Sequence, residues 1–295
     1  MVCVPFKYVA VDSYDEAVRA LVEYGEEAKI LAGGQSLVSM LNLRLARPAV
    51  LVDINPVEAP APRQDGNRLI LSAMTRHSRI LDSETVRRES PLLTAALANV
   101  GNVRVRNRGT VGGTLAHGEG TSEVCTVSLA LDGEITARGP AGDRTIRAQD
   151  LFLGFLTTAL EPDEVITGLT LDTMGFGQGW SFHEMVRRSS DYAIVGVGVS
   201  VELHPVSGVV VAARIGLGGV ADRPVLAGGD LIESLVGEVP SDEKLAEAAR
   251  AAAAATSPRS DIHASGSYRQ RLVEVLTRRG LREAVRRAHE SLEAA

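Results

Sequence analysis

The sequence predicts an α+β fold, with two small α/β units followed by a C-terminal α+β domain that contains an antiparallel sheet and helices. Three observations predict this fold. Short apolar stretches alternate with helix-patterned ones over residues 3–171, and two glycine-rich loops, 31–37 and 108–120, interrupt the alternation. Three extended apolar stretches then follow one another over residues 180–216, ahead of a helical C-terminus.

The composition is that of an ordinary globular protein. The 295 residues are 45% hydrophobic and 23% charged, which suggests about two domains. A net charge of −6 gives no basis for binding nucleic acid or an anionic membrane. No apolar run reaches the length of about 18 residues that a spanning helix needs, and the N-terminus lacks a signal-peptide pattern. We therefore expect a cytoplasmic protein without a membrane span.

The chain has only two cysteines, Cys3 and Cys125. Iron–sulfur clusters and structural zinc sites need a larger or more closely spaced set of ligands. The six histidines show no HxxxH or HExxH spacing, so no metal site is predicted. Cys125 lies in an apolar stretch and is predicted to be a small buried hydrophobic residue.

The first unit is predicted to span residues 1–57. Ser13 is a suitable N-cap for a helix with apolar residues at helical spacing, and Gly25 is a suitable end for it. The expected elements are strands 3–9, 28–31 and 49–54 and helices 15–24 and 36–43.

The second unit is predicted to span residues 58–176, after a proline-rich linker over residues 56–62. Residues 74–78 introduce a helix that we expect to run to about Arg87. The other expected elements are strand 68–73, helices 91–100 and 124–131, a hairpin over 134–148, and short elements at 149–155 and 165–171.

The third unit is predicted to span residues 177–295, and the glycines in residues 175–179 indicate a linker before it. An alanine run over residues 251–255 favours a helix, because alanine is the best helix former. The expected elements are antiparallel strands 180–186, 193–203 and 209–216, helices 224–236 and 241–255, and two helices after Ser267 separated near Gly280.

The two glycine-rich loops are the strongest candidates for a ligand site. They read Leu31-Ala32-Gly33-Gly34-Gln35-Ser36-Leu37 and Arg108-Gly109-Thr110-Val111-Gly112-Gly113-Thr114-Leu115-Ala116-His117-Gly118-Glu119-Gly120. Paired glycines let backbone N–H groups approach a ligand because no Cβ intervenes, and the flanking hydroxyls suit a diphosphate. A helix that begins inside the first loop would point its N-terminus at that ligand. The alternative is two glycine turns at strand ends that bind nothing.

Four polar residues have a functional and a structural interpretation each. His117 and Glu119 could form an acid/base pair, since histidine titrates near neutrality, or could simply be turn residues. Glu123 could accept hydrogen bonds from ligand hydroxyls, or could cap an apolar helix, where the helix dipole favours a carboxylate. Tyr192 presents a flat ring beside a charge pair at a strand entrance, and is by default an aromatic residue at a strand edge.

Other motifs narrow the function only by exclusion. Neither GxGxxG after a first strand nor GxxxxGK[ST] occurs, so an ordinary dinucleotide fold and a nucleotide triphosphatase are both unsupported. Arg104, Arg106 and Arg108 alternate and predict the solvent-facing side of an extended segment, with an anion site as the alternative. The residues alone therefore predict a protein that binds a phosphorylated cofactor.

At these motifs the sequence resembles the FAD-binding medium subunits of the molybdenum hydroxylases, the family of carbon monoxide dehydrogenase and xanthine dehydrogenase. Residues 32–37 resemble the family's first FAD loop, AGGxSL, and residues 105–117 resemble the second, (I/V)RN(R)GT(I/V)GGNLAH. The likeness covers nearly the whole chain. Further matching stretches are Leu51-Val52-Asp53-Ile54-Asn55, Thr75-Arg76-His77-Ser78, Arg188 with Asp191-Tyr192-Ala193, and Ser267-Tyr268-Arg269.

The resemblance implies a PCMH-type FAD-binding domain made of the first two units, followed by a domain like the C-terminal domain of the CO dehydrogenase flavoprotein. It implies an FAD-dependent oxidoreductase subunit that transfers electrons from a small [2Fe–2S] subunit through FAD to an acceptor. The substrate would be oxidised on a large molybdenum-cofactor subunit. The count of two cysteines agrees, because the clusters must then lie on another chain.

The resemblance also implies which residues hold FAD. Backbone N–H groups and the hydroxyls of Ser36 and Thr110 would bind the diphosphate, and Glu123 would lie near the ribose and ribityl hydroxyls. Val100 and Ile166 would be apolar flavin contacts, and Tyr192 would lie near the isoalloxazine ring. The predicted cofactor-binding residues are Ala32, Gly33, Gly34, Gln35, Ser36, Leu37, Val100, Thr110, Val111, Gly112, Gly113, Thr114, Glu123, Ile166 and Tyr192.

The sequence departs from the family pattern around the flavin. Thr114 replaces a usual Asn, Gly118-Glu119-Gly120 replaces Ala-Asp-Pro, and a Lys that is common around His183 or Glu184 is absent. These changes bear on FAD affinity and redox potential. Two alternatives therefore remain: a stand-alone FAD-dependent oxidoreductase, and a cofactor-free binding or scaffold protein of the same fold. The substrate and the electron acceptor are not encoded in these motifs.

Overall fold

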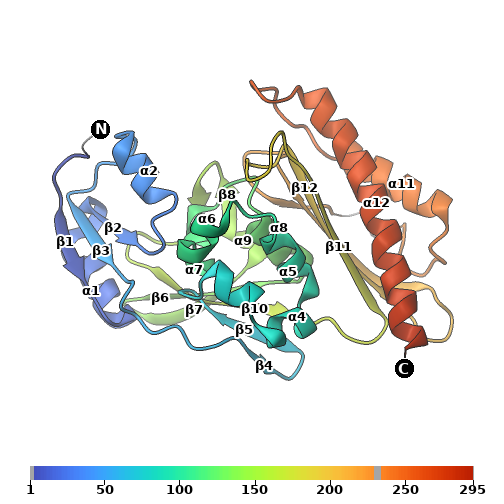
Figure 1. Ribbon diagram of the computed structural model, residues 1–295, viewed down its shortest axis with the longest axis horizontal. Helices are drawn as coiled ribbons and strands as arrows, with labels where there is room; N and C mark the ends of the chain where they lie inside the picture. The colour runs from blue at the N-terminus through green and yellow to red at the C-terminus, as the bar shows by residue number, and fades with distance from the viewer. Residues whose placement is uncertain (1–2, 229–233, 295) are drawn as a thin grey trace.

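A parallel three-stranded sheet organises the N-terminal part of the chain. The computed structural model describes residues 3–228 and 234–294 (Figure 1). The strands lie in the order β1-β3-β2, and every residue of the central strand is buried. Ser13 caps the first helix by accepting a hydrogen bond from the Glu16 N–H, as the sequence predicts. The elements are β1 (Lys7–Ala10), α1 (Tyr14–Tyr24), β2 (Ala28–Leu31), α2 (Leu37–Asn42) and β3 (Val50–Asp53).

An antiparallel five-stranded sheet follows, in the order β4-β5-β10-β6-β7. Its strands are β4 (Arg63–Asp65), β5 (Arg68–Ser72), β6 (Glu134–Gly139), β7 (Gly142–Arg147) and β10 (Val165–Asp172). Short helices cover it: α3 (His77–Leu81), α4 (Glu84–Glu89), α5 (Pro91–Leu97), α6 (Val103–Arg108), α7 (Val111–His117), α8 (Glu123–Ala130) and α9 (Ala148–Leu151). A small ribbon, β8 (Phe152–Gly154) and β9 (Thr157–Thr158), lies beside them.

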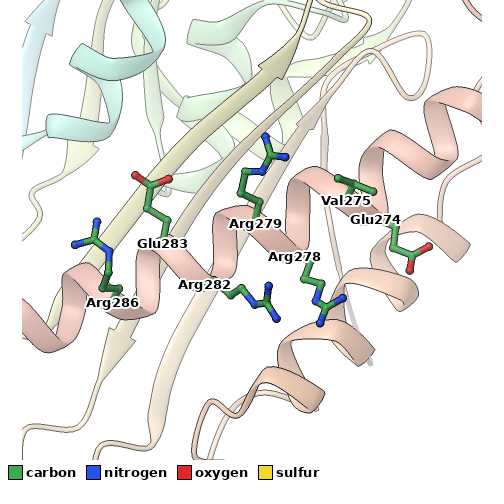
Figure 2. A pocket seen from close by; sticks show the side chains of 7 residues that line it. All are labelled: Glu274, Val275, Arg278, Arg279, Arg282, Glu283 and Arg286. Atoms are coloured by element: carbon green, nitrogen blue, oxygen red, sulfur yellow. The ribbon is translucent and has the colours of Figure 1, made fainter.

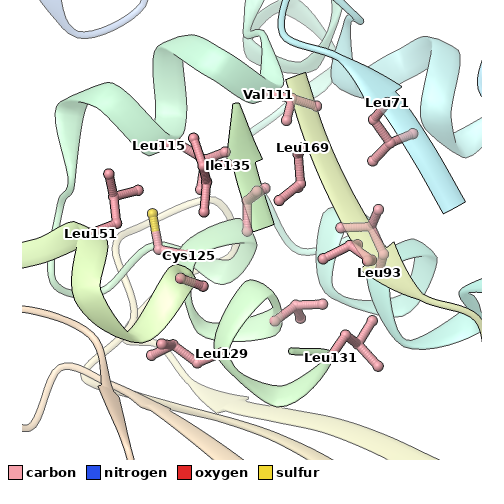
Figure 3. Close-up of a cluster of buried hydrophobic side chains, with 14 of the residues drawn as sticks. Leu71, Leu93, Val111, Leu115, Cys125, Leu129, Leu131, Ile135, Leu151 and Leu169 are labelled. Atoms are coloured by element: carbon pink, nitrogen blue, oxygen red, sulfur yellow. The ribbon is translucent and has the colours of Figure 1, made fainter. Parts of the chain in front are cut away.

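Helix α8 is the centre of the main hydrophobic core. Residues 124–130 are all buried, so the helix is apolar around its whole circumference, as expected for a helix with protein on all sides. Figure 3 shows Leu129 and Cys125 of this helix among Leu93, Ile135 and Leu169. Cys125 is fully buried, which confirms the prediction of a small buried residue.

The C-terminal domain is an antiparallel sheet with two helices. The strands β11 (Gln178–Met185), β12 (Val195–Leu203), β13 (Val210–Gly218) and β14 (Val225–Leu226) lie in that order. Figure 1 shows this sheet between the helices of the preceding domain and the long helix α12 (Gly266–Glu293), with α11 (Asp242–Ala254) beside α12. The predicted α+β fold class is confirmed.

Glycines let helices approach both faces of this sheet closely. A Cβ on Gly216 would lie 2.1 Å from the Thr126 carbonyl oxygen of α8, and one on Gly218 would lie 2.8 Å from Thr126 Oγ1. On the other face, a Cβ on Gly179 would lie 1.8 Å from the Ala284 carbonyl oxygen of α12. Any side chain at these positions would push a helix away from the sheet.

The predicted break near Gly280 is wrong, because a single helix runs through it. A Cβ on Gly280 would lie 2.8 Å from Ser181 Oγ, and the Ser181 hydroxyl donates to the Gly280 carbonyl. This glycine therefore serves close contact between a helix and a sheet, and does not end the helix.

Three other expectations fail locally. Residues 225–226 form a strand and not the start of a helix over 224–236, of which residues 229–233 lie outside the described residues. The helix expected to run to about Arg87 is two helices, α3 and α4, the second capped by Ser83. The alternating arginines lie on α6 and not on an extended segment, because Asn102 caps that helix by accepting from the N–H groups of Arg104 and Val105.

Within the described part of the chain, no helix combines the length and the apolar character needed to cross a membrane.

We predict that Gly216→Ala destabilises the folded protein by about 1–3 kcal/mol, because overpacking a close contact forces the backbone to shift. The added Cβ would lie 2.1 Å from the Thr126 carbonyl oxygen. Thermal unfolding of the variant measures the effect. Gly175→Ala is the matched control, since a Cβ there meets nothing within 4 Å. Equal melting temperatures for the two variants would contradict this account of the α8–sheet contact.

Candidate functional site

The first glycine loop leaves backbone donors free. It joins β2 to α2, and Gly34 adopts a φ of +74°, a left-handed conformation that favours glycine. The N–H groups of Gln35, Ser36 and Leu37 have no hydrogen-bond acceptor among residues 3–228 and 234–294. Successive free amides at a helix start form a concave anion site.

The two glycine loops touch each other. A Cβ on Gly33 would lie 2.3 Å from the Arg108 carbonyl oxygen and 3.0 Å from the Gly109 Cα. Arg76 ties the same junction, since its guanidinium donates to the Arg108 carbonyl and to the Asn55 side-chain oxygen. Segments far apart in the sequence are thereby brought to one place, as expected for a shared ligand.

The second loop differs from the first in that its amides are already used. The Val111 N–H donates to the Thr75 carbonyl (3.2 Å) and the Gly112 N–H to the Ala73 carbonyl (2.8 Å). The buried Thr110 caps α7, and its Oγ1 accepts from the Gly113 N–H at 3.2 Å.

The paired glycines of the second loop also face different ways. A Cβ on Gly112 would lie 2.5 Å from the Ala73 Cβ, so this glycine packs on β5 and its extension. A Cβ on Gly113 would lie 2.7 Å from Thr110 Oγ1 and 3.6 Å from the Ala32 Cβ, toward the first loop. Because Gly113 has no side chain, the space between the two loops stays open at this position.

His77 lies beneath the second loop as a buried neutral group. Burial lowers the pKa of its imidazole to about 4, so it carries no charge at neutral pH. Its Nε2 lies 3.2 Å from the hydroxyl of Thr114, which also donates to the Thr110 carbonyl. Thr114 thus supports the loop from below through two contacts.

Carboxyl groups gather at the start of α8. Burial, with added repulsion from Glu184 and Glu119, raises the pKa of Glu123 to about 8. Burial raises the pKa of Glu184 to about 7. Tyr192 is affected by the same carboxyls: the residue is 74% exposed, and desolvation with the charges of Glu119 and Glu123 raises the pKa of its hydroxyl. Perturbed carboxyls beside an exposed aromatic ring mark a candidate ligand site.

The two predicted apolar flavin contacts lie differently in the fold. Val100 is half-buried, packs against the main core, and its carbonyl accepts from the Arg106 guanidinium at 2.9 Å. Ile166 is 3% exposed and lies in β10 at a bulge between Ile166 and Gly168. Both belong to the domain that carries the second loop.

The sequence analysis does not include Glu184 or Arg76 among the cofactor-binding residues, although it notes the absence of a family Lys around His183 or Glu184. The signal for Glu184 is a charged residue two positions after Phe182, on the strand face that also presents Trp180. The signal for Arg76 is weaker, because its role depends on carbonyl and amide groups that only the fold brings within reach.

A cavity of about 470 Å³ lies elsewhere, along α12 (Figure 2). Arg278, Arg279, Arg282 and Arg286 line it together with acidic residues, and none belongs to a glycine loop. Arg282 is already held by Asp242 at 2.8 Å and Arg286 by Glu290. This cavity is not part of the site between the loops.

Two family models match the chain. The FAD binding domain in molybdopterin dehydrogenase matches residues 4–171, and the CO dehydrogenase flavoprotein C-terminal domain matches residues 180–284. The chain belongs to the family of FAD-binding medium subunits of molybdenum hydroxylases. The resemblance seen in the sequence is confirmed, and so is FAD as the cofactor.

Relatives of this medium subunit match it over almost its full length. A 6-hydroxypseudooxynicotine dehydrogenase complex subunit alpha of Paenarthrobacter nicotinovorans is 37% identical and covers 98% of the chain and 97% of its own length. The carbon monoxide dehydrogenase medium chain of Hydrogenophaga pseudoflava is 34% identical over 95% and 96%. The solved carbon monoxide dehydrogenase from Hydrogenophaga pseudoflava superposes with a TM-score of 0.92 at 33% identity, over 96% and 98% of the two chains.

The residues of this medium subunit fit FAD. Free amides in the first loop suit a diphosphate. The Glu184 Oε2 atom is buried without a hydrogen-bond partner in the described residues, and suits a ligand donor. The space in front of Gly113 suits close approach of a ligand to the backbone.

We predict that Gly113→Val and Gly112→Val fail in different ways. Gly113→Val should leave the fold intact and lose bound FAD, with about 1 kcal/mol of stability lost through the Thr110 cap. Gly112→Val should unfold at lower temperature, because its side chain meets β5. Circular dichroism and FAD per chain after gel filtration separate the two effects. Gly175→Val is the control, and full FAD retention by folded Gly113→Val would refute the assignment.

The raised carboxyl pKa values predict a stability that falls with rising pH in the FAD-free protein. The folded pKa of Glu123 is about 8, above the ordinary value of 4.5. Its contribution is therefore fully present below about pH 4.5 and is lost as the pH rises through about 8. Glu123→Gln should flatten this fall, measured by urea unfolding at about pH 5 and about pH 8.5. The exposed Glu243→Gln is the control, and a wild-type slope in Glu123→Gln would contradict the assignment.

Proposed function

We propose that this medium subunit transfers electrons from iron–sulfur clusters on a small partner subunit, through its FAD, to an acceptor. The complex would also contain a large subunit with the molybdenum cofactor, where the substrate is oxidised. The observation that best supports this role is the junction of two glycine loops in a chain of this family, with free amides on the first loop and buried carboxyls near the second.

The proposal assigns a role to each predicted contact. The free amides of the first loop, with the hydroxyls of Ser36 and Thr110, bind the diphosphate. Glu123 accepts hydrogen bonds from ribityl or ribose hydroxyls, and Tyr192 covers the isoalloxazine ring. The bound FAD supplies a centre that takes up electrons singly or in pairs. The protein's own contribution is to bind and orient that centre and to limit the access of water.

The cysteine count supports the partner assignment. A chain with two cysteines, of which Cys125 is fully buried, cannot supply the thiolates of [2Fe–2S] clusters. The clusters must then belong to another chain. The names of the relatives are consistent, since one is a subunit of a dehydrogenase complex and another is a medium chain.

We predict that a chemically reduced [2Fe–2S] subunit of the same complex reduces the FAD of this chain. The flavin's visible absorbance should bleach on anaerobic mixing, and should not bleach with the oxidised small subunit. Direct reduction by a small-molecule donor such as NADH, without any partner, would favour a stand-alone oxidoreductase. A folded chain that binds no FAD would refute the proposal altogether.

A further inference from the structure

The side chain of Asn55 contacts the first glycine loop and Arg76 at the same time. Asn55 follows β3, and the Ile54 N–H before it donates to the Leu31 carbonyl at 3.1 Å, so β2 and β3 leave their sheet side by side. The Asn55 Nδ2 donates to the carbonyl of Ala32, the first residue after β2, at 2.8 Å. The Asn55 Oδ1 accepts from Arg76 Nη2 at 2.5 Å.

Arg76 continues this connection to the second loop. Its Nη1 donates to the Arg108 carbonyl, and its backbone pairs with Thr110 in an isolated antiparallel bridge. The Arg108 carbonyl is also the atom against which Gly33 packs, since a Cβ on Gly33 would lie 2.3 Å from it. The hydrogen-bonded pair of Asn55 and Arg76 therefore meets both loops where their backbones touch, and we call it the Asn55–Arg76 bridge.

Asp53 fixes the orientation of the Asn55 amide. Burial would raise the pKa of the Asp53 carboxyl, but hydrogen bonds from Tyr8 and Asn55, with the charge of Arg108, hold that pKa below its ordinary value. The ionised carboxylate can only accept, and it accepts from the Asn55 backbone N–H at 2.9 Å and from Nδ2. Nδ2 thus faces two acceptors and Oδ1 faces a donor, so a reversed amide would put like groups together at every contact.

The bridge acts on the spacing of the loops. Ala32, whose carbonyl Asn55 holds, is also the residue of the first loop that faces Gly113: a Cβ on Gly113 would lie 3.6 Å from the Ala32 Cβ. The position of Ala32 therefore sets the width of the space between the loops. A binding site works only when supporting hydrogen bonds hold its geometry to within about 0.5 Å.

We propose that Asn55 and Arg76 are positioning residues for the FAD diphosphate, and that their bridge sets the spacing of the two loops before FAD binds. This inference rests on the diphosphate-binding role proposed above for the first loop. Both residues act through backbone carbonyls, those of Ala32 and Arg108, and protein oxygens occupy both Nη groups of Arg76. The competing reading is that Arg76 binds the diphosphate directly as a cation.

Titration of FAD into the FAD-free full-length chain tests the bridge, with dissociation constants from flavin fluorescence. Asn55→Ala removes the bridge and should weaken FAD binding by about tenfold or more. Arg76→Lys keeps the charge but loses the planar fork that reaches two acceptors, so it should weaken FAD binding as much as Arg76→Met does. The double variant Asn55→Ala/Arg76→Met should bind FAD no more weakly than the weaker single variant, because the two residues form one bridge.

Asn67→Ala and Arg287→Met are the matched controls. Asn67 is exposed in the turn between β4 and β5. Arg287 makes the same kinds of contact as Arg76 but lies on α12: it donates to the Trp180 carbonyl at 2.8 Å and contacts a Glu283 carboxylate oxygen at 2.6 Å. Both control variants should bind FAD like the wild type.

Circular dichroism and thermal unfolding separate positioning from loss of the fold. The FAD-free Asn55→Ala and Arg76→Lys proteins should be folded, and FAD should raise their melting temperatures less than that of the wild type. Wild-type affinity in Asn55→Ala or in Arg76→Lys, or additive losses in the double variant, overturns the inference. If one single variant does not fold, the other decides; if neither folds, the role is structural and the inference fails. A wild type that binds no FAD defeats the proposed function as well.

Discussion

The close approach of α8 to the C-terminal sheet is the contact on which the rest of the structure depends. Only glycine fits at position 216, because the Thr126 carbonyl lies where a Cβ would be. The same helix is buried on every side in the core of the preceding domain. It therefore joins two hydrophobic cores that would otherwise be separate. An additional methyl group at this contact would move a domain and not just a side chain.

The two glycine loops have different structural roles although their sequences are similar in composition. The second is rigid: Thr110, Thr75 and Ala73 take up the first amides of α7, so its backbone is held by the protein itself. The first keeps its amides free and touches the second at Gly33. The rigid loop thus supports the one that can bind an anion. A site of this kind is preorganised, because the cost of ordering the backbone is met during folding and not during binding.

Sequence reasoning succeeded where the signal is local and failed where it depends on distant contacts. The Ser13 cap, the hairpin after α8 and the three long strands of the C-terminal sheet follow from periodicity and turn residues. Gly280 was misread, because a glycine that ends a helix and one that admits a neighbouring strand look the same in sequence. The loops were recognisable as motifs, but which of their amides remain free depends on carbonyls of β5 and its extension.

The carboxyl group at the site links binding to stability. Burial raises the pKa of Glu123 and Glu184, and neither forms an ion pair with a described residue, so the FAD-free protein loses stability when these carboxyls ionise. Protonation at lower pH removes that penalty, and a ligand that binds only the folded state offsets it by mass action. The carboxyls of the site therefore lower the stability of the FAD-free protein, a pattern expected where function and stability conflict. The site also has opposite polarity at its two ends: the free amides of the first loop are donors, and the carboxyls near α8 are acceptors when ionised. A ligand of the reverse polarity would meet like groups at both ends.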